Sequence, residues 1–206
     1  MTEIMIASMT DGQIETVVDQ LRAAMRKHQN EVTKDGAQLA LGTDNLGMRM
    51  FVPFRDLAEA QGEMIVRHVR VDRTKTPSQM VDTLGRKKYV DNDVRAMMPT
   101  QGKDEDDVYF FPAKRFIPAA ELAAEYEKRG LIPDHYAQMQ VSIDDPSFAD
   151  EHPNGSQWQD EKGRYCYLAI NRWDDERYVN VNQDDNDWRD NWWFAGVRKL
   201  AVPASE

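Results

Sequence analysis

The chain has 206 residues, with 36 acidic and 26 basic side chains, a formal net charge of -10 and a single cysteine. This length supports one domain with a full hydrophobic core or two small ones, and the lone cysteine excludes an internal disulfide. No apolar run approaches the roughly 20 residues that span a bilayer, and the first ten residues lack the features of a secretory signal, so we expect a soluble, cytoplasmic protein that does not enter a membrane.

The first 62 residues predict helices. Thr10 and Gln13 have the spacing of a capping box, which opens an amphipathic helix over residues 11–29. Thr33 and Thr43 are further N-cap candidates, for a short helix over 34–41 and for a third helix from about 44 that Pro53 must kink or split. Three helices of about 50 residues in total form a marginal core alone, so we expect this module to pack on something else.

From residue 63 the hydrophobic period changes. Residues 65–71 alternate as a half-buried strand does, and Thr76 with Pro77 predicts a short helix that ends at Gly85. Residues 108–111 read as a buried strand after an acidic turn at 104–107. Two more helices are expected, and they cover about 118–129 and 133–141.

After Pro153 the pattern is that of short strands. We expect them at 157–158, 164–173, 177–182 and 191–200, with the turn at 160–163 joining a hairpin. Together with the helices, this predicts an α+β protein with an N-terminal helical module at 1–62 and a second domain at 63–206 that has short antiparallel strands.

Catalytic motifs are missing from the sequence. Its four histidines are scattered singly, no G-x-S-x-G or S-x-x-K serine is present, and neither common nucleotide-binding glycine motif occurs. Cys166 lies between two tyrosines in a predicted strand, where a small buried side chain is the expected role. We therefore expect a protein that is not an enzyme, with no catalytic residue, no resident metal and no cofactor.

Charge is uneven along the chain. Residues 1–62 carry -3, residues 63–103 carry +4 and residues 104–206 carry -11, and all five tryptophans lie in the last quarter. The global acidity argues against nucleic acid as a partner. Phosphate contact stays open for one cationic run, whose other reading is a solvated strand edge and helix end: Arg67, Arg70, Arg73, Lys75, Arg86, Lys87 and Lys88.

The segment from Asn171 to Asn191 is the most informative. It holds five asparagines, seven acidic residues, Tyr178, Trp173 and Trp188. Tyrosine and tryptophan offer rigid contact area, and asparagine and aspartate offer adaptable hydrogen bonds, so this composition favours a binding surface over an inert loop. The run from Asp184 to Asp187 is also rich in oxygen ligands; it lacks the EF-hand order, and a loop-based calcium site remains open.

Several segments between Ala119 and Lys199 resemble a C-type-lectin-like domain of the formylglycine-generating-enzyme-like branch. Residues 121–130 resemble its helix with a basic-glycine end, 156–158 its short strand, 164–173 and 177–182 its central strands, and 193–198 its closing strand. The family includes the variable proteins of diversity-generating retroelements, whose ligand-binding residues precede the closing strand. Residues 10–60 also look like a helical module of uncharacterised bacterial proteins.

The resemblance implies ligand-binding positions, to which the composition adds Trp173. The full candidate set is Asn171, Trp173, Asp174, Asp175, Tyr178, Asn180, Asn182, Asp184, Asn186, Asp187, Trp188, Asp190 and Asn191. The enzyme branch needs a redox cysteine pair, which a chain with one cysteine does not have, and the glycine-rich R-G-G-S-W stretch of the family is missing.

Two functions are consistent with these features of the sequence. The first is non-catalytic binding of a protein or glycan ligand through residues 171–191, as in a retroelement variable protein. The alternative is an intracellular regulatory or interaction protein whose acidic surface mimics nucleic acid. The sequence leaves the oligomeric state open.

Overall fold

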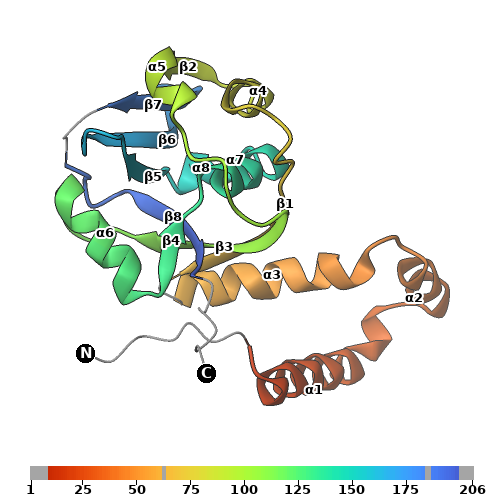
Figure 1. Ribbon diagram of the computed structural model, residues 1–206. Helices are drawn as coiled ribbons and strands as arrows, with labels where there is room; N and C mark the ends of the chain where they lie inside the picture. Colours follow the sequence, from red (N-terminus) through yellow and green to blue (C-terminus); the bar gives the residue numbers. More distant parts are fainter. Residues whose placement is uncertain (1–8, 62–63, 184–186, 200–206) are drawn as a thin grey trace, which may run out of the picture. The chain divides into compact units, whose positions relative to one another are not determined.

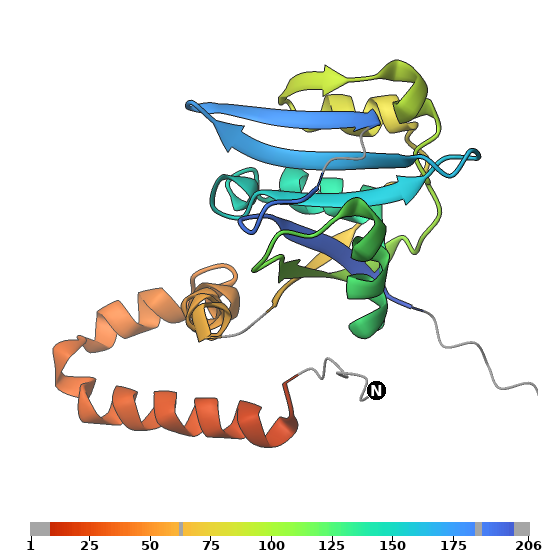
Figure 2. The same cartoon turned by 90° about the vertical axis from the view of Figure 1, so that its left-hand side faces the viewer.

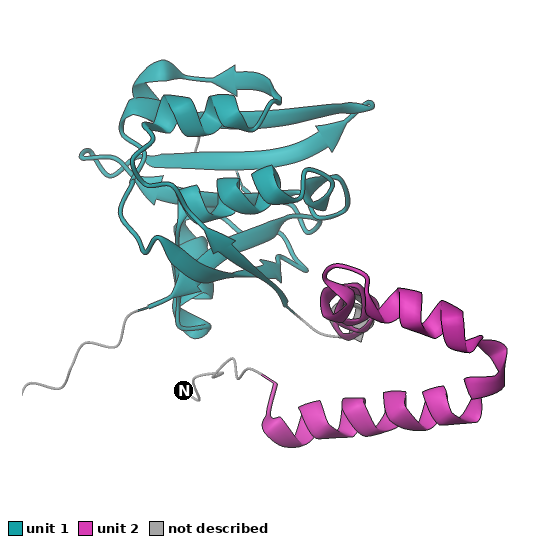
Figure 3. Ribbon diagram, turned by 90° about the vertical axis from the view of Figure 1, so that its right-hand side faces the viewer, with its two compact units in different colours: residues 1–4, 63–206 teal, residues 5–62 magenta. Residues whose placement is uncertain are grey.

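The computed structural model describes residues 9–61, 64–183 and 187–199. It divides the chain into two compact units, residues 5–62 and residues 1–4 with 63–206 (Figure 3). The division falls where the hydrophobic period of the sequence changes. Helices and a mostly antiparallel sheet make the chain an α+β protein. No helix in the described part of the chain is long and apolar enough to cross a bilayer.

The regular elements of residues 9–61, the described part of the first unit, are helices. These are α1 (Asp11–Lys27), the 3-10 helix η1 (Gln29–Glu31), α2 (Lys34–Leu41) and α3 (Leu46–Gln61). The predicted capping box is confirmed, because Thr10 accepts from the Gln13 amide and the Gln13 side chain accepts from the Thr10 amide. Thr33 caps α2 as predicted. The prediction for Thr43 is wrong: its hydroxyl donates to the Leu39 carbonyl, and α3 starts later.

The second unit is a sheet with helices. Its strands are β1 (Ile65–Arg70), β2 (Lys87–Val90), β3 (Glu105–Pro112), β4 (Leu131–Pro133), β5 (Asn154–Gln159), β6 (Tyr165–Trp173), β7 (Glu176–Gln183) and β8 (Trp193–Arg198). Its helices are α4 (Pro77–Thr83), α5 (Asn92–Ala96), α6 (Ala119–Lys128), α7 (His135–Asp144) and α8 (Phe148–Glu151). The strand order is β1-β3-β8-β5-β6-β7-β2, and β4 pairs with β8 (Figure 1).

Most neighbouring strands are antiparallel, as the sequence predicts, and two pairs are not. β5 runs parallel to β8, and β2 runs parallel to β7. The hairpin of β5 and β6 is confirmed, with Gly163 at φ 76 in its turn. The capping box at Thr76 and the glycine stop at Gly85 are confirmed as well.

The prediction of an acidic turn at 104–107 is wrong. Three of those residues belong to β3, which pairs with β1. The reason is charge pairing across the two strands: His68 bonds Asp107 and Glu105 at 2.9 Å each, and Arg70 lies 3.2 Å from Glu105. Opposite charges facing each other on neighbouring strands stabilise the pairing.

The larger hydrophobic core lies on the face of the sheet that α7 covers (Figure 1). Leu168, Ile170, Val179 and Val181 point to it from β6 and β7, and all four are fully buried. Because successive side chains of a strand point to opposite faces, the residues between them face the other way. We call the face toward α7 the inner face. Figure 2 shows the opposite side, where α6 crosses β8 and leaves β6 and β7 uncovered.

Candidate functional site

The uncovered side of β6, β7 and β2 carries most of the residues that the sequence singles out. The strand registers place Asn171 beside Tyr178 and Lys87, and Ala169 beside Asn180 and Tyr89. Tyr167 pairs with Asn182, and Trp173 with Glu176. We call this surface the outer face; its residues are Lys87, Tyr89, Tyr167, Ala169, Asn171, Trp173, Glu176, Tyr178, Asn180 and Asn182.

Aromatic rings and one polar network cover the edge of the outer face. Trp173 is 64% exposed and Tyr89 is 54% exposed, and the ring centroids of Tyr89 and Tyr178 are 5.5 Å apart. Glu176 accepts from Lys87 at 2.6 Å and from the Tyr178 hydroxyl at 2.7 Å. These bonds raise the pKa of Lys87 and of Tyr178 and lower the pKa of Glu176. The network is therefore a fixed, charge-balanced feature near neutral pH.

A hollow of about 190 Å³ opens in the middle of the same surface. Its lining consists of Tyr167, Ala169, Asn171, Asn180, Asp187, Trp188 and Trp192. The Asn171 side-chain oxygen is buried there and accepts no hydrogen bond from the described residues. An unpaired buried acceptor costs free energy that a donor from a bound molecule would recover.

Trp188 forms one wall of the hollow and is held rigidly. It is 8% exposed, its indole N–H donates to the Gln157 side chain at 3.1 Å, and its backbone pairs with Ile117 at 2.8 and 2.9 Å. Its ring lies over Gly155, where an added Cβ would come within 2.5 Å of it. Trp188 therefore fixes the shape of the hollow and offers little exposed surface to a ligand.

The structure brings five of the thirteen predicted residues onto the outer face: Asn171, Trp173, Tyr178, Asn180 and Asn182. Asp187 and Trp188 join them at the hollow. Asp174 and Asp175 lie in the turn between β6 and β7, at φ 45 and 65, and Asp190 and Asn191 lie exposed before β8. Asp184 and Asn186 fall outside the described residues.

Five residues of the outer face are not among the thirteen candidates. Lys87 and Tyr89 come from β2, a strand that the sequence does not predict, and Tyr167, Ala169 and Glu176 come from β6 and β7. Residues 87–90 are two lysines followed by tyrosine and valine, so their polarity does not alternate and periodicity gives no signal for this strand. Much of the cationic run is neutralised, since Lys88 pairs with Asp82 at 2.5 Å and Arg73 pairs with Asp134 at 2.6 Å.

The described residues contain no group of three or more side chains that could hold a metal ion. The calcium alternative rested on the run from Asp184 to Asp187, of which only Asp187 is described.

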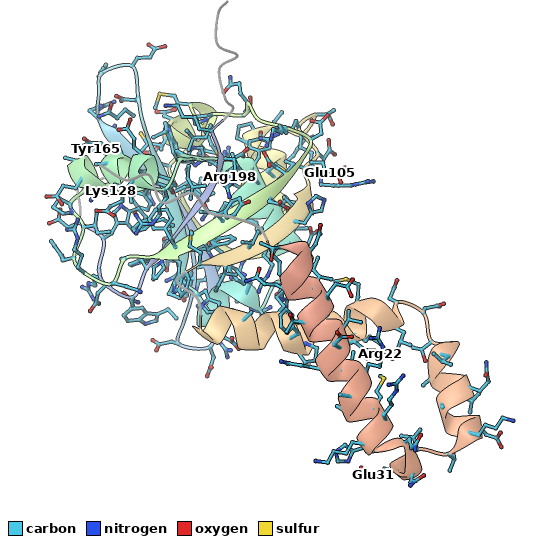
Figure 4. All side chains as sticks on the ribbon, turned by 90° about the horizontal axis from the view of Figure 1, so that it is seen from below. Arg22, Glu31, Glu105, Lys128, Tyr165 and Arg198 are labelled. Atoms are coloured by element: carbon cyan, nitrogen blue, oxygen red, sulfur yellow. The ribbon has the colours of Figure 1, made fainter. Side chains whose placement is uncertain are left out.

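A larger cavity of about 490 Å³ lies elsewhere, between α6, β4 and the hairpin of β5 and β6. Tyr165 and Trp158 line it together with residues of α6, and Figure 4 labels Tyr165 on that side of the unit. The Trp158 indole nitrogen is buried, and no residue in the described part of the chain accepts a hydrogen bond from it. None of the thirteen predicted residues lines this cavity, so it is a second hollow, separate from the outer face.

One serine and one histidine meet inside the second unit. The Ser156 hydroxyl lies 2.6 Å from His135 Nδ1 and donates to the Gln138 side-chain oxygen, while Gln138 donates to the Asn154 side chain at 2.8 Å. Since the serine proton goes to an oxygen that can only accept, His135 must donate to the serine. A catalytic serine needs the reverse. His135 is 2% exposed and Ser156 is fully buried, so this network serves packing between α7 and β5.

Acid should destabilise the protein through His135. Burial lowers the pKa of His135 to about 3, against an ordinary value of 6.5 in the unfolded chain. The unfolded state therefore binds a proton that the folded state does not, and stability falls as pH drops below 6.5. We expect a loss of about 2 kcal/mol between about pH 7.5 and about pH 5.

Urea unfolding of the wild type and of His135→Gln at both pH values measures this loss. The variant should lose most of the pH dependence; the same dependence in both proteins would contradict the assignment to His135. The pKa of His68 is raised by its bonds to Asp107 and Glu105, so His68 acts in the opposite direction. Its side chain is exposed, and we expect a small effect.

No protein-family model, no curated protein and no solved structure matches the chain.

Proposed function

We propose that the outer face and its hollow bind a protein or glycan ligand without catalysis. The observation that carries the proposal is the convergence of three strands on one uncovered surface of tyrosine, tryptophan and asparagine side chains. Rigid aromatic rings beside adaptable amides are the composition of binding surfaces. The unpaired Asn171 oxygen in the hollow adds a position where a ligand donor gains a hydrogen bond.

A C-type-lectin-like domain is part of this proposal. Its support is the secondary structure of the segments that resemble the family: 121–128 lies in α6 and is followed by Gly130 with φ 63, 156–158 lies in β5, and the central and closing segments lie in β6, β7 and β8. We propose on the same basis that the ligand-binding segment corresponds to that of a retroelement variable protein.

The charges on the outer face limit the kind of ligand that we expect. On the outer face Glu176 is paired with Lys87, and among the described residues of the face and its hollow the exposed Asp187 is the one other carboxylate, so free negative charge is limited to one position. We therefore expect a ligand rich in hydrogen-bonding groups rather than a strongly basic one. The alternative, a nucleic-acid mimic, gains no support from residues 104–107, because Glu105 and Asp107 pair with His68 and Asp106 pairs with Lys103 at 3.2 Å.

The test is binding of the full chain to printed panels of glycans and of cell-surface proteins. A variant with Tyr89, Trp173 and Tyr178 changed to alanine should lose at least about tenfold of the affinity for any retained panel member, because exposed aromatic contacts dominate such interfaces. A matched control changes Val66 and Ile132, exposed apolar residues on β1 and β4, to alanine.

The control should bind as the wild type does, and all three proteins should unfold at similar temperatures. If the wild type binds no member of either panel, the proposal is contradicted. Equal binding by the triple variant would contradict it as well.

A further inference from the structure

Helix α1 carries an apolar stripe that no other described residue of the helical unit covers. Ile14, Val18, Leu21 and Met25 are each between 40% and 54% exposed, and no residue of α1 is buried. Four large apolar side chains in one row are more than the scattered exposed hydrophobics of an ordinary surface. The stripe is therefore a candidate interaction surface.

A helix of this size needs such a contact. α1 has 17 residues, only slightly more than the length of about 12–15 residues below which isolated helices are marginal in water. Its capping box stabilises one end, but most helix stability in proteins comes from packing of the apolar side. Something must cover the row from Ile14 to Met25 if α1 is to persist.

The spacing of the row favours another helix as the cover. Its members follow one another at intervals of four, three and four residues. This repeat of about 3.5 residues is the seam of a two-stranded coiled coil, which keeps facing its partner along the helix.

The distribution of charge along α1 favours a second copy of α1 as the partner helix. Asp11, Glu15 and Asp19 lie in its first half, and the basic Arg22 and Arg26 lie in its second. Two copies of α1 that run antiparallel about a two-fold axis place each acidic half against a basic half. The same axis sets Ile14 against the partner's Met25 and Val18 against the partner's Leu21.

The residues beside the seam fit the same arrangement. Glu15 and Arg22 are seven residues apart, so both flank the seam on one side, and the two-fold axis brings Glu15 of each copy to the partner's Arg22. Val17 and Ala24 flank the other side and are both apolar. In a parallel pair, Arg22 would face the partner's Val17 and would gain no ion pair. Arg22 now pairs with Asp19 of its own helix, an exposed contact that it can exchange at little cost.

We propose that the chain forms a homodimer in which two α1 helices pack antiparallel along the row Ile14, Val18, Leu21 and Met25. The dimer carries two copies of the outer face, so a ligand with repeated epitopes is bound with higher avidity than by one copy.

Sedimentation equilibrium of the full chain tests the dimer. The wild type should be dimeric at about 100 µM, and Leu21→Glu should be monomeric, because a charge would be buried in the seam. A monomeric wild type at that concentration would overturn the proposal. A Leu21→Glu chain that dimerises as the wild type does would overturn it too.

Charge variants test the antiparallel register. Arg22→Glu sets like charges opposite each other twice per dimer, so the dissociation constant should rise about tenfold. Arg26→Glu makes the same change in charge on the same helix, away from the seam, and should alter the constant by less than about twofold.

The exchange of both charges, Glu15→Arg with Arg22→Glu, should restore wild-type dimerisation. Equal effects of Arg22→Glu and Arg26→Glu, or a double variant no better than Arg22→Glu, would overturn the register.

Discussion

Replacing Trp188 with alanine should lower the free energy of unfolding by about 3–5 kcal/mol, the usual cost of removing a large buried aromatic side chain. The ring packs against Tyr167, Trp192 and Phe194, with centroids 5.2–5.8 Å apart. The change also leaves the Gln157 side-chain oxygen without its indole donor. Trp188 is thus a support of the hollow, although the sequence suggests a ligand contact.

Urea unfolding measures the Trp188 effect, and Trp173→Ala is its control. Trp173 is 64% exposed, so its loss should change stability by less than about 0.5 kcal/mol. Equal destabilisation by both variants would contradict the distinction between a structural and a contact tryptophan. A stable Trp188→Ala would show that the loop before β8 is not anchored through this ring.

Replacing Asp134 with alanine should cost about 3–5 kcal/mol, because it leaves the buried guanidinium of Arg73 without its counter-charge. Asp134 accepts two hydrogen bonds from Arg73, at 2.6 and 3.1 Å, and their side chains are 4% and 11% exposed. Asp134 also caps α7 by accepting from the Ala137 amide at 2.9 Å. The same carboxylate therefore orders α7 and the loop that Arg73 crosses.

Two variants separate the functions of Asp134. Asp134→Asn keeps an oxygen for the cap but removes the charge, so it should cost less than Asp134→Ala and more than Glu105→Ala. Glu105 pairs with Arg70 on the exposed surface, where solvent screens the interaction and its loss should have little effect on stability. Thermal unfolding of all three ranks them, and equal losses for Glu105→Ala and Asp134→Ala would contradict the account.

Local signals in the sequence predicted the ends of many elements correctly. Thr10 and Thr76 cap helices, and Gly85 and Gly163 lie in the turns where they were expected, because each of these devices depends on a few neighbouring residues. Thr43 fails as a cap since its hydroxyl has a competing carbonyl one turn earlier.

What the sequence could not predict depends on residues far apart in the chain. β2 adds to the sheet by parallel pairing with β7, which lies about 90 residues later, and the acidic strand β3 is fixed by the cations of β1. Of the candidate site, composition and resemblance identified the segment, and the registers of β6 and β7 place Asn171, Tyr178 and Asn180 on one surface. The burial of Trp188 depends on Gly155 and Gln157 and could not be inferred from its own segment.

The most direct test of the proposed binding surface is hydroxyl-radical footprinting of the full chain with and without a panel member that it retains. Binding at the outer face should protect Tyr89, Trp173 and Tyr178 from oxidation and leave Tyr165, at the cavity beside α6, unchanged. Protection of Tyr165 alone, with the three outer-face residues as reactive as in the free protein, would place the ligand in that cavity and contradict the account.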